Sequence, residues 1–259
     1  MAENEPDPSP LQDLQAEHTR EAIGLRLSAR THSYLRDFIY GSVDGTVTTF
    51  AIVAGVIGAH LPGGIAVVLG LTNLAADGFS MAISNFLGTR AERQETASAR
   101  VREYAHIAAL PEGEREEIRQ IFARKGFQGP DLDRAVEVIT NDPRIWVETM
   151  VSDELGLQLH GASPLRAGTA TLIAFVLAGA VPLAPYLILL TPSVPRFDPF
   201  PVSAVLAGLT FFAIGALKGR FVITRWHISG IETLAVGGAA AAIAYGAGML
   251  LRQLTDRIF

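Results

Sequence analysis

Residues 45–76 read GTVTTFAIVAGVIGAHLPGGIAVVLGLTNLAA and contain no Asp, Glu, Lys or Arg. A helix that crosses the apolar core of a bilayer needs about 20 mainly apolar residues, so this stretch provides most of two crossings. His60–Gly64 (HLPGG) divides it, because proline removes a helix hydrogen-bond donor and paired glycines favour a turn. The pattern predicts two membrane-spanning helices, near residues 37–60 and 64–88.

Three further stretches without charge follow. They lie between Arg166 and Arg196, between Asp198 and Lys218, and between Glu232 and Arg252. They predict spans near 166–190, 200–218 and 229–251, with Pro182 and Pro185 expected to kink the first of these three. Charged residues make up only 18% of the chain, against about a quarter in ordinary soluble proteins. We therefore expect an all-α membrane protein with five transmembrane helices.

The remaining residues give the domain organisation. Residues 1–36 are predicted to form a disordered tail, over 1–10, and a peripheral amphipathic helix within 11–35. Residues 37–88 carry the first two spans and residues 166–259 the last three. Between them, residues 89–165 are predicted to form a three-helix insert, with helices near 89–110, 112–125 and 131–141 followed by a segment, 143–156, that leads into the third span.

Positive charges predict the orientation in the membrane. Lys and Arg gather on cytoplasmic flanks. In this chain, Arg20, Arg26, Arg30 and Arg36 precede the first span. Lys218, Arg220 and Arg225 lie in the link between the fourth and fifth spans. Arg252 and Arg257 oppose this assignment but are outnumbered. We expect a multi-pass protein of the cell (inner) membrane whose N-terminus and 89–165 insert are cytoplasmic.

Composition also excludes several functions. A net charge of −5 without a basic patch argues against nucleic acid as a partner. The chain has no cysteine, so a disulfide framework and thiolate ligands are excluded. It has no Walker loop, so ATP hydrolysis is not expected. We expect neither an enzyme nor a bound prosthetic group.

Ionisable groups inside spans are costly and are candidates for function. Asp44 lies about two turns into the first span. The second span carries Asn73, Asp77 and Met81 at helical spacing, together with Ser80 and Ser84, and such a polar stripe with a thioether suits the path of a divalent cation. The alternatives are that Asp44 faces lipid headgroups and that the stripe is a polar seam between helices.

The insert offers three pairs of possible metal ligands. Each pair shares a helix face, and the pairs are Glu103 with His106, Glu114 with Glu117, and Met150 with Glu154. Convergence of the three faces would create one site with carboxylate, imidazole and thioether ligands. The alternative is a solvated acidic face. A ferritin-like di-iron centre is rejected, because the insert has no second Glu-x-x-His pair.

Several motifs resemble the vacuolar iron transporter family, whose bacterial members sit in the cell membrane. The most specific are DFIYGSVDG at residues 37–45 and NLAADGFSMA at residues 73–82, supported by LGTRAE at 87–92 and DELGL at 153–157. The similarity runs from about Tyr34 to Leu251. It implies a homodimer with a pore on the two-fold axis, lined by the first two spans of each copy, and transport of Fe²⁺ and also Mn²⁺ out of the cytosol in exchange for protons.

The resemblance also assigns roles to residues. The family's pore aspartate falls on Asp44 and its pore methionine on Met81. Its ligands in the cytoplasmic domain fall on Glu103, Glu114, Glu117, Met150 and Glu154. Two positions depart from the plant-type pattern: Asn73 stands where a carboxylate is expected, and His106 stands where a glutamate is expected.

The sequence therefore predicts a proton-coupled exporter of divalent iron in the lipid bilayer. The departure at Asn73 leaves the proton stoichiometry open. The departure at His106 leaves open the selectivity among iron, manganese, Co²⁺ and Zn²⁺. Two other functions remain: a carrier mainly for manganese, and a non-transporting membrane sensor or buffer whose insert binds divalent metal.

Overall fold

The structure is a computed structural model that describes residues 18–28, 32–221 and 224–258. The chain divides into two units, Met1–Ser33 and Tyr34–Phe259. Among its described residues, the first unit holds one helix, α2 (Arg20–Ser28), which lies within the segment predicted to form the amphipathic helix. The disordered tail predicted at residues 1–10 lies outside the described residues.

The second unit confirms the predicted fold class. Five of its segments are long and apolar enough to span a membrane, and the described residues contain no β-strand. These segments are α3 (Leu35–Gly58), the first part of α4 (Gly63–Ala109), α8 with η2 and α9 (Pro164–Ile188), α10 (Pro199–Phe221) and α11 (Trp226–Ile258). The break between α3 and α4 covers residues 59–62 and includes His60–Pro62, where the sequence predicts a turn.

Helix α3 lies at the centre of the membrane part and contacts α4, α8, α10 and α11. Its closest neighbour is α8, and glycines allow this approach. A Cβ on Gly41 or Gly45 would meet the backbone of Thr171 or Phe175, and one on Gly179 would meet the carbonyl of Gly45. The glycines of the DFIYGSVDG motif therefore admit a neighbouring helix.

The third span changes its helical form where the sequence predicts a kink. α8 (Pro164–Ala180) is followed by the 3₁₀ turn η2 (Val181–Leu183) and by α9 (Ala184–Ile188). Pro182 and Pro185 lie in these two short elements. The carbonyl of Pro182 accepts a 2.6 Å hydrogen bond from the Ser203 hydroxyl of α10, so a neighbouring span satisfies the backbone that the kink frees.

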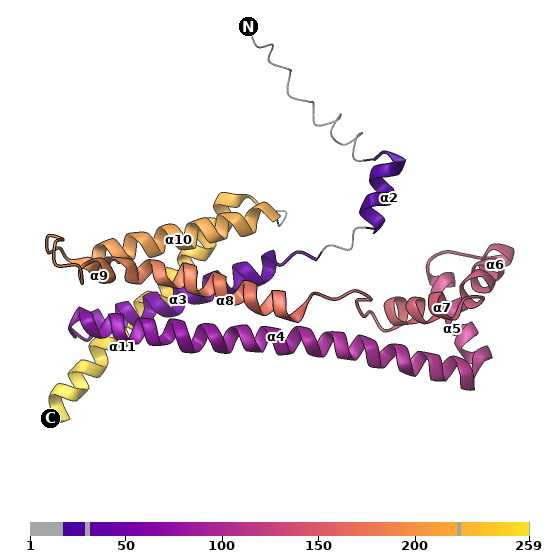
Figure 1. Cartoon of the computed structure of the whole chain (residues 1–259), viewed down its shortest axis with the longest axis horizontal. Helices are drawn as coiled ribbons and strands as arrows, with labels where there is room; N and C mark the ends of the chain where they lie inside the picture. Colours follow the sequence, from indigo (N-terminus) through magenta and orange to yellow (C-terminus); the bar gives the residue numbers. More distant parts are fainter. Residues whose placement is uncertain (1–17, 29–31, 222–223, 259) are drawn as a thin grey trace, which may run out of the picture. The chain divides into compact units, whose positions relative to one another are not determined.

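The insert consists of the end of α4 and four shorter elements, α5 (Pro111–Arg124), α6 (Gly129–Thr140), α7 (Pro143–Thr149) and the π-helical turn η1 (Met150–Glu154). Figure 1 shows α4 continuing unbroken from the membrane part into the insert. One apolar cluster of the insert forms around Ile118, Val136, Trp146 and Met150. The returning chain is held on α4 by Thr96, which donates to the Gln158 carbonyl, and Arg100, which donates to the Leu159 carbonyl.

Candidate functional site

The structure brings three of the insert's predicted ligands together. Glu103 and His106 lie one turn apart near the end of α4, and Pro111 starts α5 after Leu110 breaks the helix, so Glu114 returns beside them. Nδ1 of His106 lies 4.0 Å from a carboxylate oxygen of Glu103 and 3.7 Å from one of Glu114. One donor atom from each residue falls within 4.8 Å of the others. We call Glu103, His106 and Glu114 the insert cluster.

The insert cluster is buried on its carboxylate side. Glu103 and Glu114 are only 5% and 7% exposed, whereas the His106 side chain is 59% exposed. One carboxylate oxygen of Glu114, Oε2, is buried without a hydrogen-bond partner. A buried carboxylate oxygen without a partner is costly. A cation between the two carboxylates would remove that cost.

Two further glutamates add negative charge at this position. Desolvation raises the pKa of the Glu114 carboxyl, and the charges of Glu117, Glu103 and Glu154 raise it further. The pKa of Glu154 is raised by desolvation and then by Glu117 and Glu103. His106 opposes both shifts. Four carboxylates therefore act on one another here, and the insert cluster forms the centre of a strongly negative site.

Met150 and Glu154 occupy the π-helical turn η1. The turn is closed by a hydrogen bond from the Leu155 N–H to the Met150 carbonyl, five residues back. Single π turns are rare and occur frequently at functional sites. Met150 is fully buried in the apolar cluster with Ile118 and Trp146, whereas Glu154 is exposed and interacts with the insert cluster by charge.

The predicted polar residues of the spans lie on α3 and α4. Asp44 is half-buried on α3, and Asp77 lies on the neighbouring helix α4. Asn73 donates a 3.2 Å hydrogen bond to the Thr48 hydroxyl, which in turn donates to the Asp44 carbonyl. Asn73 therefore joins the two helices one turn from Asp44.

The rest of the stripe differs in exposure. Asp77, Ser80 and Ser84 are exposed, whereas Met81 is partly buried against the apolar core that the membrane-spanning helices form. The stripe therefore presents a carboxylate and two hydroxyls on a surface of the single chain, at a position along α4 where the neighbouring residues are apolar enough to lie in lipid.

A hydrogen-bonded group that the sequence analysis missed lies at the end of the stripe. Asn85 donates 2.9 Å and 2.7 Å hydrogen bonds to a carboxylate oxygen of Asp37 and to the Thr171 hydroxyl. This contact joins α3, α4 and α8. The helical spacing of the sequence could have predicted this role, because Asn85 follows Met81 by four residues and so lies on the same polar face of the second span.

The chain has five apolar helices, carboxylates within two of them, and a buried acidic cluster in the insert. Together these features define a multi-pass membrane protein with sites suited to cations. The comparisons with known proteins then give the family. The VIT family model matches residues 35–249. The chain belongs to the VIT family, which is a family of transporters, and the resemblance predicted from the motifs is confirmed.

Three relatives show the extent of the similarity. Vacuolar iron transporter 2 of Oryza sativa subsp. japonica is 33% identical over 222 residues, which cover 85% of this chain and 88% of that protein. Vacuolar iron transporter 1 of Arabidopsis thaliana is 31% identical over 213 residues, covering 82% and 83%. The vacuolar iron transporter of Toxoplasma gondii is 32% identical over 230 residues, covering 85% and 74%.

Proposed function

We propose that this protein is a transporter that moves divalent iron, and also manganese, out of the cytosol in exchange for protons. The observation that carries the proposal is the presence of two carboxylates, Asp44 and Asp77, on two neighbouring membrane-spanning helices. Carboxylates inside a membrane are costly and mark ion pathways and proton relays. The relatives are named vacuolar iron transporters, and these names indicate iron as the metal.

A homodimer is the second part of the proposal. Asp77, Ser80 and Ser84 are exposed in the single chain, and a carboxylate turned toward lipid would carry a large energetic cost. A second copy packed on the polar stripe would remove these groups from lipid and enclose a hydrated path between the copies. Asp44 and Met81 would then coordinate the ion, with Met81 adding a soft ligand that suits Fe²⁺ better than Mg²⁺ or Ca²⁺.

Protons are proposed to act at Asp44. A proton that arrives from the far side would neutralise the carboxylate and weaken its hold on the ion, so release and proton entry would be coupled. Asn73 does not titrate and contributes a hydrogen bond to Thr48 instead. The second carboxylate available for a proton in this region is therefore Asp77.

The insert is proposed to collect cytosolic metal before it enters the path. Glu103, His106 and Glu114 offer two oxygens and one nitrogen within 4.8 Å of one another, and Glu117 and Glu154 add negative charge. Met150 lies buried in the apolar cluster of the insert, and we propose that its thioether adds a soft ligand to the same site. The proposed orientation places the N-terminus and the insert on the cytoplasmic side of the cell membrane, as the positive charges predict.

The test is metal uptake into proteoliposomes that contain the purified protein, with Fe²⁺ outside and an imposed pH gradient. We expect uptake that follows the gradient and is lost in Asp44→Ala, whereas Asp131→Asn, an exposed carboxylate of the insert, leaves it unchanged. Transport by Asp44→Ala at the wild-type rate would contradict the mechanism. No flux in the wild-type protein, together with tight metal binding, would favour a membrane sensor or buffer.

A further inference from the structure

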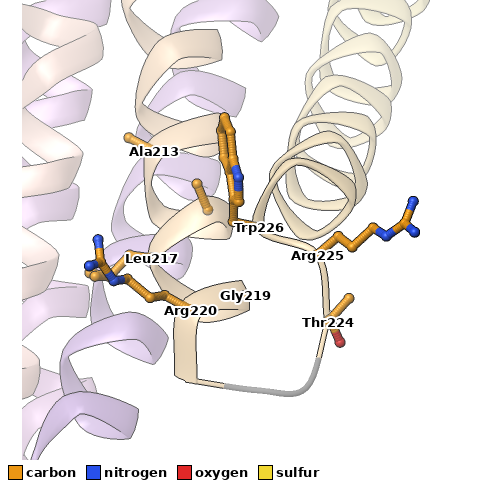
Figure 2. A pocket seen from close by; sticks show the side chains of 8 residues that line it. Ala213, Leu217, Gly219, Arg220, Thr224, Arg225 and Trp226 are labelled. Carbon is orange, nitrogen blue, oxygen red and sulfur yellow. The ribbon is translucent and has the colours of Figure 1, made fainter. Parts of the chain in front are cut away.

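A cavity of about 860 Å³ opens where α10 ends and α11 begins. Its walls carry two arginines, Arg220 and Arg225, and one large aromatic residue, Trp226, while the helix side of the cavity is formed by Ala213, Ala216 and Leu217. Figure 2 shows Trp226 between the two helices, with the side chains of Arg220 and Arg225 reaching to either side of it. The cavity therefore combines an apolar wall with a cationic rim.

The charge of this rim is not balanced within the described chain. The four charged residues between Asp198 and Arg252 are Lys218, Arg220, Arg225 and Glu232. Lys218 pairs with Glu232 at 3.3 Å. No ion pair involving Arg220 or Arg225 occurs among the described residues, and both side chains are exposed. Two guanidinium groups thus remain available to an anion.

The position of the cavity indicates the kind of anion. Both helices are candidate membrane spans, so their joined ends lie where the apolar core of the bilayer meets the headgroups. Trp226 is 56% exposed and packs edge-on against Phe212, in the manner of tryptophans at membrane interfaces. Glycines bring the two helices close together here, because a Cβ on Gly219 would lie 2.8 Å from the Trp226 backbone.

We propose that this cavity binds an anionic glycerophospholipid. Its phosphate would lie at the cationic rim to which Arg220 and Arg225 belong, because guanidinium groups donate to phosphate oxygens in a planar fork. One acyl chain would follow Ala213 and Leu217 along α10 toward the middle of the bilayer. A zwitterionic lipid fits less well, because its ammonium group would lie beside the arginines. This site does not depend on metal transport.

The test is native mass spectrometry of the full-length protein in detergent, titrated with phosphatidylglycerol or phosphatidylcholine. We expect phosphatidylglycerol to bind at least tenfold more tightly. Arginines near a membrane surface contribute about fivefold each to the binding of anionic lipid, so Arg220→Gln with Arg225→Gln is expected to lose roughly thirtyfold. Arg252→Gln with Arg257→Gln, at the other end of α11, removes the same charge and is expected to change binding less than about twofold.

Two further arms distinguish the possible outcomes. Leu217→Trp fills the apolar wall and leaves both arginines, so it is expected to weaken phosphatidylglycerol binding without any change in charge. Inorganic phosphate in excess is expected not to displace the lipid. Wild-type lipid binding by the Arg220/Arg225 variant, equal binding of the two lipids, or full displacement by inorganic phosphate would each overturn the proposal.

Discussion

Glu114 provides the sharpest test of the insert cluster, because its charged carboxylate lowers the stability of the protein when no metal is bound. It is 7% exposed, one of its oxygens has no hydrogen-bond partner, and Glu103 lies in the same cluster. The substitution Glu114→Gln keeps the size of the side chain and removes the charge. We expect it to stabilise the metal-free protein and to weaken metal binding at the same time.

The magnitude follows from the geometry. Two unit charges 4.8 Å apart, the upper limit for the donor atoms of Glu103 and Glu114, repel by about 3.5 kcal/mol at an effective dielectric constant of about 20. His106 offsets part of this repulsion when it is protonated, but solvent screens that attraction because the ring is exposed. A gain of about 2–3 kcal/mol remains, which corresponds to a rise in Tm of about 5–10 °C for a chain of this size.

The assay is thermal unfolding of the purified protein in detergent, first with a chelator and then with Mn²⁺. Metal at about 100 times its Kd stabilises the wild-type protein by about 2.7 kcal/mol, and Glu114→Gln should gain much less. Glu116→Gln is the matched control, because Glu116 lies on the same helix and pairs with Arg119 outside the cluster. A lower Tm for metal-free Glu114→Gln than for the wild type, with an equal gain from Mn²⁺, would refute the reasoning.

Three other predictions follow from particular contacts. The pKa values of Glu114 and Glu154 are raised, so metal must displace protons from them at a pH where an ordinary glutamate is already ionised. Calorimetric titration should therefore show that the affinity for Mn²⁺ falls on acidification, by up to about tenfold per pH unit for each proton displaced. The stability of the metal-free protein should change in the opposite direction and fall as the pH rises through the raised pKa. Gly45→Ala puts a methyl group against the Phe175 backbone and should lower the free energy of unfolding by about 1–3 kcal/mol or more. Size-exclusion chromatography and thermal unfolding would detect this loss. Gly64→Ala is the control and should be tolerated, because a Cβ at Gly64 would lie in open space. Asn85→Ala leaves Asp37 and Thr171 without their shared donor and should cost about 1–3 kcal/mol; an unchanged Tm would show that the contact does not hold α3, α4 and α8 together.

The sequence was sufficient to predict the membrane fold, because a span is determined by the absence of charge over a fixed length. The windows after Asp44, Arg166, Asp198 and Glu232 leave little choice about which segments can lie in lipid. The proline pair at Pro182 and Pro185 likewise predicted the interruption of the third span. The neighbour of each helix could not be predicted. The contact of Gly41 and Gly45 with α8 depends on a partner more than 120 residues away in the chain.

The candidate site was predicted in part. Helical spacing showed that Glu103 and His106 share a face, but only the turn at Leu110 and Pro111 determines that Glu114 returns to them. Spacing also treated Met150 and Glu154 as one helical face. The structure places both residues in the π turn η1, where Met150 is buried in the apolar cluster around Trp146 and Glu154 is exposed. A π turn has no reliable sequence signature, so this local helical form could not be predicted.

The length of α4 separates the proposed capture site in the insert from the proposed path through the membrane. Met81 and Glu103 lie on the same unbroken helix, and at about 1.5 Å per residue they are roughly 33 Å apart along its axis. One ion cannot be held by both sites, so in the proposed export the insert cluster would act before the ion reaches the membrane path. Substitutions in the insert cluster should therefore raise the metal concentration needed for half-maximal uptake and leave the maximal rate near the wild-type value. Substitutions of Asp44 should lower the maximal rate itself, and an equal fall in maximal rate for both sets would mean that the insert takes part in the passage step.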